Sequence, residues 1–333
     1  MSSIPESVIV VGGGENEEHE VSLASAAAVA EALQDAGYLV DPVTIGRDGI
    51  WRLGEQVLGQ TPADSLTAVL PALGHADVLF PAVHGPLGED GTLAALCALT
   101  HTHLVGSDLR AGAIGMDKGL TKLVAESVGV RTAPGRVIAA AEIGEIEFEG
   151  DVVVKPVSSG SSYGVSLAQD AAQLSDALRT AARFDRRILI ESVVRAREID
   201  VAVIREADGS CWSPPPLEIH ASGVFDTDMK YDGTAQFTVP AVLTTDERTA
   251  LVRAARTMFD ALGCRGVARM DFFLTADGPV LNEVNTMPGM TAFSQVPRMF
   301  AAAGVDYPEL ITRLVQGAAV PGPVRQEALR GTT

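Results

Sequence analysis

Residues 266–285 decide the fold, and they read GVARMDFFLTADGPVLNEVN. Two runs rich in aliphatic and aromatic residues, 266–274 and 279–285, flank the turn sequence TADG, and this pattern predicts a β-hairpin. If the turn is centred on Asp277, position 271 lies opposite position 283, and position 269 lies opposite position 285. The sequence therefore predicts that polar side chains of the two strands meet across the hairpin.

The polar residues of this hairpin are expected on one face, because side chains alternate across a strand. That face would carry Arg269, Asp271 and Phe273 on the first strand, and Leu281, Glu283 and Asn285 on the second. Asp271, Glu283 and Asn285 offer oxygen donors, which suit Mg²⁺ bound together with substrate phosphates. Arg269 could then neutralise an anion held beside the metal.

The alternative is an exposed hairpin whose charges simply pair across the strands. The sequence that follows favours a ligand site. Residues 285–291 read NTMPGMT, so the polar face runs directly into a Pro-Gly turn. At Gly289 the backbone amide can approach a ligand closely.

Upstream of the hairpin, strand and helix signals alternate. Apolar strands are expected at 7–11, 40–45 and 77–83, separated by helix patterns at 22–36, ended by Gly37, and at about 92–99. Strands separated by helices predict a parallel sheet with helices on its faces. Further strands are expected at 151–155, 165–167, 187–191 and 198–205, with helices at 117–128, 171–184 and 246–262. We predict an α/β fold with three domains, residues 1–112, 113–200 and 201–333.

Two loops have the composition of ligand-binding loops. The strand VVVKP, residues 152–156, leads into SSGSSYG, residues 158–164, whose backbone amides could fold over phosphate oxygens beside Lys155. The alternative there is a flexible Ser/Gly connector. The second loop, HGPLGEDG at residues 84–91, follows a strand end, where open α/β sheets place ligands. Its His84 could also be purely structural.

The glycines at 12–14 do not form a dinucleotide-binding loop. The third glycine of that motif is replaced by Glu17, and further glutamates at 15, 18 and 20 would repel a pyrophosphate. A turn that aims carboxylates at a cationic ligand, such as a substrate amine, fits better. The alternative is a solvated acidic loop.

Composition narrows the classes of partner. The 333 residues carry 25 basic and 43 acidic side chains, a net charge of −18, which disfavours nucleic acid and anionic membranes as partners. The three cysteines, Cys97, Cys211 and Cys264, form no CxxC pair, which fits a reducing compartment. With no apolar run near the length of a bilayer span and no apparent secretory signal, we expect a cytoplasmic protein.

In this order, the motifs resemble the D-alanine–D-alanine ligase family of the ATP-grasp superfamily. The resemblance spans about residues 8–300 and rests on GG at 13–14, EHEVS at 18–22, HG at 84–85, GEDG at 88–91, MDK at 116–118, VKP at 154–156, GSSYG at 160–164, KY at 230–231, RMD at 269–271 and EVNTMPGMT at 283–291. It implies a parallel-sheet domain followed by a two-lobed, α+β ATP-grasp fold. It also implies a homodimer.

The resemblance implies a nucleotide site and a metal site. Lys118, Lys155 and the Ser/Gly loop with Ser162 would contact the ATP phosphates, and Glu191 and Glu198 the adenine and ribose. Asp271, Glu283 and Asn285 would hold two Mg²⁺ ions, or Mn²⁺, bridging the phosphates. Ligases of this family phosphorylate one D-alanine and let the amine of a second D-alanine displace the phosphate, which makes a peptidoglycan precursor.

Roles in substrate binding and catalysis follow from the same resemblance. Glu18 would hold the first ammonium with His84 near its carboxylate, while Glu18, Ser161 and Tyr231 would order the closing loop and help deprotonate the attacking amine. Arg269 and the Gly289 amide would stabilise the oxyanion, and Lys230 and Ser294 would grip the second carboxylate. Residues 222–240 would form a lid that excludes water.

The chain also departs from the family pattern. The loop after the glycines is unusually acidic, the lid is short, and Gln295 stands where leucine is usual. These departures bear on the second substrate, so a ligase using D-serine, D-lactate or another amine is the alternative. Tyr231 favours an amine, because the D-lactate members carry phenylalanine there. A non-catalytic nucleotide-binding module is disfavoured because the metal residues are all present, and an oxidoreductase by the broken glycine motif.

Overall fold

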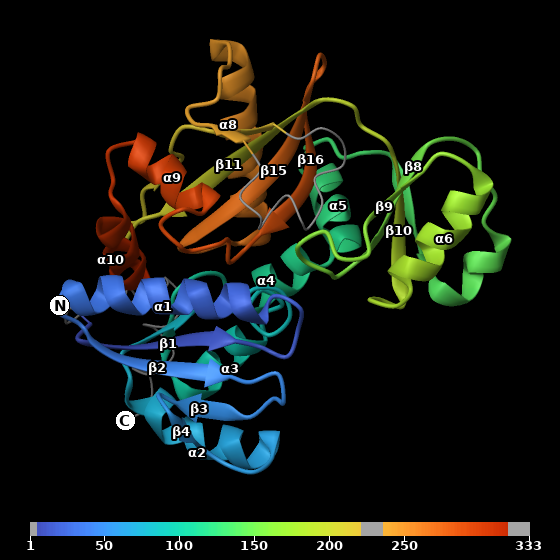
Figure 1. Cartoon of the computed structure of the whole chain (residues 1–333). Helices are drawn as coiled ribbons and strands as arrows, with labels where there is room; N and C mark the ends of the chain where they lie inside the picture. Colours follow the sequence, from blue (N-terminus) through green and yellow to red (C-terminus); the bar gives the residue numbers. More distant parts are fainter. Residues whose placement is uncertain (1–4, 221–235, 319–333) are drawn as a thin grey trace, which may run out of the picture.

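The computed structural model describes residues 5–220 and 236–318. Its N-terminal part is a six-stranded sheet in the order β4-β3-β2-β1-β5-β6 (Figure 1). The strands are β1 (Ser7–Gly13), β2 (Leu39–Ile45), β3 (Trp51–Leu53), β4 (Gln56–Val57), β5 (Val78–Pro81) and β6 (His103–Leu104). β1, β2, β5 and β6 are parallel, which confirms the predicted parallel sheet.

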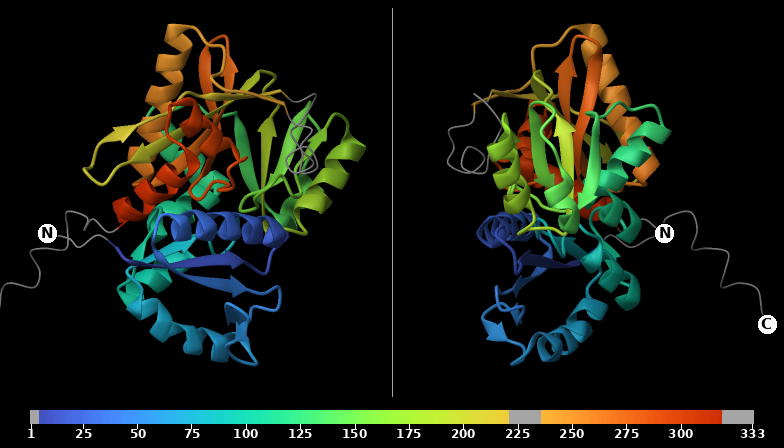
Figure 2. Two further views of the ribbon diagram at one scale, coloured as in Figure 1. Left: turned by 60° about the vertical axis from the view of Figure 1, so that its left-hand side comes forward. Right: turned by 90° about the vertical axis from the view of Figure 1, so that its right-hand side faces the viewer.

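Three helices, α1 (His19–Asp35), α2 (Pro62–His75) and α3 (Thr92–Thr100), accompany this first sheet. α1 begins three residues earlier than predicted, because the acidic EHE sequence is suited to the positive end of a helix dipole. It ends where expected, before Gly37 with its left-handed φ of 89°. α1 lies between the first sheet and the C-terminal part of the molecule (Figures 1 and 2).

The second sheet is antiparallel and four-stranded, in the order β7-β10-β8-β9. It comprises β7 (Gly135–Ala139), β8 (Val152–Pro156), β9 (Ser166–Ala168) and β10 (Arg187–Ser192), with the 3₁₀ helix η1 (Ala140–Glu145) and α6 (Ala171–Ala181) packed against it. α6 is three residues shorter than predicted. The Ser/Gly loop joins β8 to β9, so it lies at the edge of this sheet.

The third sheet follows the order β14-β13-β11-β15-β16, with β12 paired to β11. Its strands are β11 (Arg197–Arg205), β12 (Cys211–Trp212), β13 (Leu217–His220), β14 (Gln236–Thr238), β15 (Val267–Thr275) and β16 (Gly278–Asn285). The neighbouring helices are α4 (Leu109–Met116), α5 (Lys118–Ser127), α8 (Thr245–Leu262), α9 (Gln295–Ala302) and α10 (Tyr307–Ala318). As predicted, Asp117 caps α5, where its carboxylate accepts a hydrogen bond from Leu120 N at 2.8 Å.

The decisive hairpin forms as β15 and β16, and its register agrees with the prediction at the polar end. Arg269 pairs with Asn285 and Asp271 with Glu283. Below these pairs the register shifts, so that Phe272 pairs with Leu281 and Asn282 is bulged out. The predicted face was therefore wrong at Leu281, which is buried in the core. The bulge instead turns Asn282 to the same side as Glu283.

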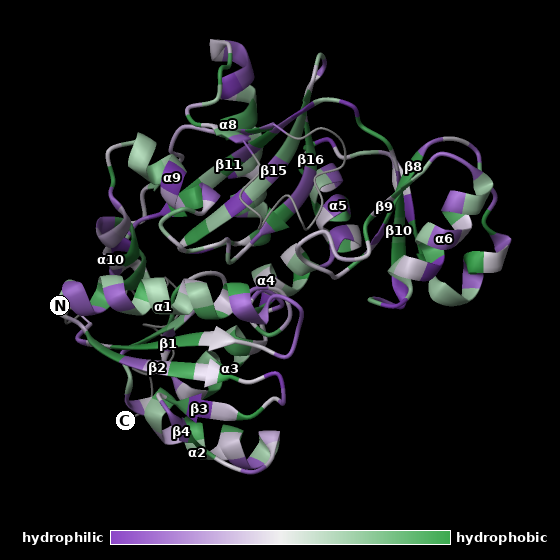
Figure 3. Ribbon diagram, viewed as in Figure 1, coloured by the Kyte–Doolittle hydropathy of each residue, from purple (hydrophilic) through white to green (hydrophobic). Residues whose placement is uncertain are grey.

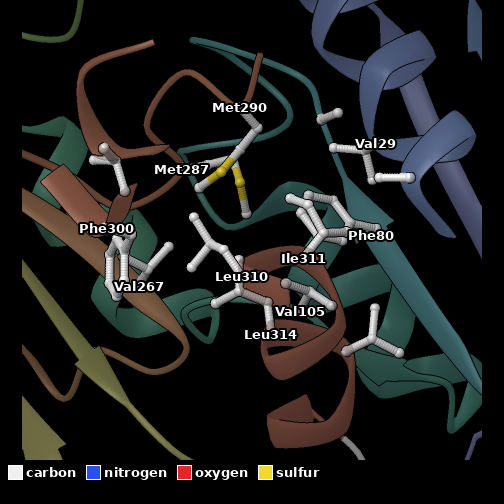
Figure 4. Packing of buried hydrophobic residues seen from close by; sticks show 14 of the residues in the cluster. Val29, Phe80, Val105, Val267, Met287, Met290, Phe300, Leu310, Ile311 and Leu314 are labelled. Atoms are coloured by element: carbon white, nitrogen blue, oxygen red, sulfur yellow. The ribbon is translucent and has the colours of Figure 1, made fainter. Parts of the chain in front are cut away.

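The largest apolar core connects the first sheet with the C-terminal helices. Phe80 of β5 and Val29 of α1 belong to the same buried cluster as Phe300 of α9 and Leu310 of α10 (Figure 4). In Figure 3 the helices α6 and α8 show both hydrophobic and hydrophilic colours, as helices with one face against a sheet do. Within the described ranges, no helix combines the length and apolar character needed to cross a bilayer.

Candidate active site

A pocket of about 400 Å³ opens between the second and third sheets. Its walls come from α5, β8, β10, β11, β15, β16 and the Ser/Gly loop, which are far apart in the sequence. The structure brings together here many of the residues predicted to bind nucleotide or metal: Lys118, Lys155, Ser162, Glu191, Glu198, Arg269, Asp271 and Glu283. The pocket therefore joins the predicted phosphate residues with two of the three predicted metal residues, whereas Asn285 does not line it.

Two lysines of the pocket are held in fixed positions. Lys118 Nζ donates to the carbonyl of Ser159 at 2.8 Å and lies 3.4 Å from Glu283 Oε2. Lys155 Nζ donates to Asn282 Oδ1 at 3.0 Å and lies 2.6 Å from Glu191 Oε2. Both side chains are mostly buried, so their charges act in a medium of low polarity, where they attract anions strongly.

Glu191 lies between two ammonium groups. Lys122 Nζ lies 2.6 Å from Glu191 Oε1, and Lys155 Nζ lies 2.6 Å from Glu191 Oε2. Burial alone would raise the pKa of Glu191, but the two lysines outweigh it and lower that pKa. Sequence reasoning missed Lys122, although its place one helical turn after Lys118 on α5 was a usable signal. It also missed Asn282, because the bulge is not part of a regular alternation.

The metal candidates lie on adjacent strands with Arg269 among them. Arg269 Nε and Nη2 bind Asp271 Oδ1 and Oδ2 at 2.7 and 2.8 Å, and Asn285 Nδ2 donates to Asp271 Oδ2 at 3.0 Å. Burial disfavours the charge of Arg269, but the adjacent carboxylates, Asp271 foremost, raise its pKa above the ordinary value. Arg269 Nη1 also donates to Gln295 Oε1 at 2.6 Å.

The donor chemistry of this group fits a divalent cation. Asp271 and Glu283 face each other in register, and Asn285 adds an amide oxygen on the same strand as Glu283. In residues 5–220 and 236–318, no three His, Cys, Asp or Glu side chains converge as a ligand set. The third donor of the candidate site is therefore the amide rather than another acid.

Glu18 is the one buried glutamate of the acidic loop, whereas Glu15, Glu17 and Glu20 are exposed. Ser161 Oγ donates to Glu18 Oε1, so the structure brings together two predicted catalytic residues that are 143 positions apart. The approach depends on glycine, since a Cβ at Gly85 or Gly160 would come within 2.5 Å of Glu18 Oε2.

The Ser/Gly loop has an unusual backbone at this contact. Ser161 and Ser162 have φ angles of 46° and 60°, a left-handed conformation that costs energy for residues other than glycine. Such strain is typical of ligand clamps and active-site loops. It aims Ser161 at Glu18 while Ser162 lines the pocket.

His84 is buried, and it lies near enough to Glu18 for that charge to act on it. Its Nε2 lies 2.9 Å from Ser25 Oγ and its Nδ1 lies 3.2 Å from the carbonyl oxygen of Met287, which fits a neutral ring that donates from Nδ1. Burial lowers the pKa of His84, against the Glu18 carboxylate, which raises it. These contacts fit the structural alternative for His84, since its ring ties Ser25 of α1 to the 285–291 turn.

Glu89 lies next to His84 and was not singled out from the sequence. Its Oε1 accepts a hydrogen bond from Gly85 N at 3.0 Å and lies 3.9 Å from His84 Nδ1. Burial, followed by the charge of Glu18, raises the pKa of Glu89 to about 8. A carboxyl that stays protonated near neutral pH can donate a hydrogen bond, so Glu89 is a further candidate residue beside His84.

Gly289 and Ser294 lie together on the turn before α9. A Cβ at Gly289 would come 3.0 Å from Ser294 Oγ, and that Oγ accepts a hydrogen bond from Thr291 N at 3.1 Å. Neither residue lines the pocket. Lys230, Tyr231 and most of the predicted lid, 222–235, lie outside the described residues, and the rest of that lid includes β14.

Comparison with known proteins gives consistent matches along the chain. The family described as "D-ala D-ala ligase N-terminus" matches residues 7–107, and "D-ala D-ala ligase C-terminus" matches residues 138–316. The D-alanine–D-alanine ligase of Streptomyces coelicolor is 38% identical, with 93% of this chain and 92% of that protein covered. That of Mycobacterium sp. (strain KMS) is 39% identical, with 95% and 96% covered.

Two solved structures are similar as a whole. The VanG D-Ala:D-Ser ligase of Enterococcus faecalis superposes with a TM-score of 0.80 at 27% identity, covering 94% of this chain and 99% of that one. The D-alanine–D-alanine ligase of Coxiella burnetii superposes with a TM-score of 0.77 at 28% identity, covering 95% and 94%. The likeness thus extends over all three sheets.

Proposed function

The chain belongs to the D-alanine–D-alanine ligase family, and from this premise we propose that it joins two D-alanine molecules in an ATP-dependent reaction that yields D-alanyl-D-alanine, ADP and phosphate. The observation that carries the proposal is the single pocket in which Lys118 and Lys155 face Asp271 and Glu283. The product would serve peptidoglycan precursor synthesis. The curated relatives named for D-alanine support this reading over a different second substrate.

The pocket would bind ATP. Lys118, Lys155 and Ser162 would contact its phosphates, and Glu198 and Glu191 its ribose and adenine. Because Lys122 and Lys155 both pair with Glu191, that carboxylate also holds the phosphate-binding lysine in place. Asp271, Glu283 and Asn285 would hold two Mg²⁺ ions, or Mn²⁺, which would neutralise phosphate charge when bound.

The substrate site would lie beside the pocket, where Glu18 meets the Ser/Gly loop. Glu18 would bind the ammonium of the first D-alanine, with His84 near its carboxylate. Phosphorylation converts that carboxylate into an acyl phosphate, whose phosphate is a good leaving group. When the second amine attacks, Arg269 and the Gly289 amide would stabilise the oxyanion of the tetrahedral intermediate.

The remaining roles involve the second substrate and the closing of the site. Ser161 and Tyr231, with Glu18, would help deprotonate the attacking amine, and Lys230 and Ser294 would bind the second carboxylate. A lid formed by 222–240 would exclude water, which otherwise hydrolyses an acyl phosphate. The division at residues 112 and 200, a homodimer and a cytoplasmic location complete the proposal.

Phosphate release tests this function directly. With ATP and Mg²⁺, we expect D-alanine alone to support turnover, and mass spectrometry to detect the dipeptide. D-Serine and D-lactate, each added with D-alanine, and L-alanine alone complete the panel. No turnover with D-alanine alone would overturn the proposal, and a mixed product formed in preference to the D-alanine dipeptide would replace it with the alternative ligase.

A further inference from the structure

A third carboxylate extends the row formed by Asp271 and Glu283. Asp200 on β11 pairs with Asp271 on β15, which in turn pairs with Glu283 on β16. All three residues line the pocket, and Asp200 is only 1% exposed. The proposed function assigns no role to Asp200, although a buried carboxylate is costly unless it has a partner of opposite charge.

Arg269 lies against both aspartates. Its Nε is 3.5 Å from Asp200 Oδ2 and 2.7 Å from Asp271 Oδ1, and its side chain is 11% exposed. Like charges placed opposite each other on neighbouring strands repel. A guanidinium between two of the three carboxylates reduces that repulsion, so Arg269 and Asp200 stabilise each other.

This arrangement matters because Asp271 has two tasks. It is a candidate cation ligand, and its two oxygens also bind the Arg269 guanidinium at 2.7 and 2.8 Å. A carboxylate that turns toward a divalent cation gives up part of its bond to arginine. A buried guanidinium without a carboxylate partner would be strongly destabilised, and Asp200 is placed to remain that partner.

We propose that Asp200 is a positioning residue that holds the Arg269 guanidinium in the pocket while Asp271 turns its carboxylate to a divalent cation. The inference rests on the proposed function for the catalytic role of Arg269. Its structural basis is the ion pair that Arg269 on β15 shares with Asp271 on the same strand and with Asp200 on the neighbouring β11. Asp200 itself touches neither the cation nor the substrate in this scheme.

A double-mutant cycle on Mn²⁺ binding tests the proposal without any D-alanine. The proteins are the full-length wild type, Asp200→Asn, Arg269→Met and the double variant, each titrated with Mn²⁺ in the presence of ADP and followed by electron paramagnetic resonance. Asp200→Asn should weaken Mn²⁺ binding about tenfold, because Arg269 then keeps Asp271 for itself. In the Arg269→Met background the same change should have less than about a twofold effect. An equal loss in both backgrounds would mean that Asp200 acts on the cation directly and would overturn the proposal.

Steady-state kinetics provide the second readout. Asp200→Asn should lower kcat about tenfold or more with a smaller change in KM for D-alanine, since a displaced Arg269 fails mainly in the transition state. Added to Arg269→Met, it should lower kcat no further. Asp200→Glu, which restores the charge, should recover part of the loss. An unchanged kcat in Asp200→Asn would contradict the positioning role.

A matched control comes from the same sheet. Glu218 on β13 is a mostly buried carboxylate that pairs with Arg197 at 2.7 Å and does not line the pocket. Glu218→Gln should leave kcat within about twofold of the wild type. If Asp200→Asn does not fold, Asp200→Ser, which also removes the charge, takes its place, and wild-type Mn²⁺ binding and kcat in that variant would overturn the proposal. If the wild type fails to turn over D-alanine, the proposed function falls, and the Mn²⁺ cycle still decides the role of Asp200.

Discussion

The pKa of Glu89 departs from its ordinary value far enough to reach the neutral range. A glutamate titrates near 4.5 in the unfolded chain, and burial beside Glu18 raises the pKa of Glu89 to about 8. Between these values the folded protein keeps a proton that the unfolded chain has lost. The contribution of Glu89 to stability is therefore fully present below about pH 4.5 and is lost as the pH rises toward 8.

Glu89→Gln should remove this dependence on pH, because glutamine has the shape of the protonated acid and does not titrate. Relative to the wild type, the free energy of unfolding of the variant should increase by on the order of 3 kcal/mol between about pH 5 and about pH 8. Urea denaturation at the two pH values measures it. Exposed Glu17→Gln is the control, and a difference from wild type that stays constant with pH would contradict the raised pKa.

The hydrogen bond from Ser161 to Glu18 gives a second prediction for a single side chain. Ser161→Ala keeps the backbone strain similar but removes the donor, so kcat for dipeptide formation should fall about tenfold while the protein stays folded. Exposed Ser158 in the same loop provides the control variant Ser158→Ala. Wild-type kcat in Ser161→Ala would show that the contact is structural only.

At the scale of elements, β10 places Glu191 between two lysine side chains that would otherwise repel each other. Lys122 comes from α5 and Lys155 from β8, and both ammonium groups lie 2.6 Å from the Glu191 carboxylate. The strand thus ties a helix beside the third sheet to the second sheet through one buried charge. Removing only the central charge leaves two like charges facing each other in a poorly hydrated space.

Glu191→Gln should therefore lower the free energy of unfolding by about 3 kcal/mol and raise KM for ATP, since Lys155 loses its fixed position. Chemical denaturation and ATP titrations measure the two effects. Glu145→Gln in η1 is an exposed control of the same chemistry. A variant as stable as the wild type, with an unchanged KM for ATP, would show that the lysines are held by other groups.

At the scale of the whole molecule, the core shown in Figure 4 implies that the first and third sheets unfold together. Trp51 lies in the first sheet, while Trp212 on β12 packs edge-on against Phe300 with ring centroids 5.3 Å apart. These are the two tryptophans of the chain. Fluorescence from each one therefore reports on a different sheet.

In each of the variants Trp51→Phe and Trp212→Phe, which keep one tryptophan, we expect the urea transition followed by fluorescence to coincide with that followed by far-UV circular dichroism. Leu310→Ala, made in both backgrounds, should move both transitions to lower urea concentration. It should lower the free energy of unfolding by about 3 kcal/mol, because Leu310 is fully buried in the shared cluster. Leu99→Ala, at an exposed leucine, is the control. Midpoints by fluorescence and by circular dichroism that separate in either variant would contradict a shared core.

Sequence reasoning predicted most of what local patterns determine. The alternating strands of the first sheet, the cap at Asp117 and the Asp271–Glu283 register follow from periodicity and turn chemistry. It could not predict the Lys122–Glu191 pair or the pKa of Glu89, because these depend on burial by distant segments. The bulge at Asn282 did leave a trace, since two apolar residues followed by two polar ones interrupt strict alternation.

The bulge at Asn282 also limits insertions and deletions in this part of the chain. The segment from Asp271 to Asn285 carries the candidate cation ligands and Asn282, the hydrogen-bond partner of Lys155. Its register depends on one extra residue in β16. A deletion in β16 next to Asn282 would remove the extra residue, and an insertion would move Glu283 to the apolar side. Alignments of active relatives should therefore show substitutions but no gaps across these fifteen positions, whereas surface loops elsewhere tolerate changes in length.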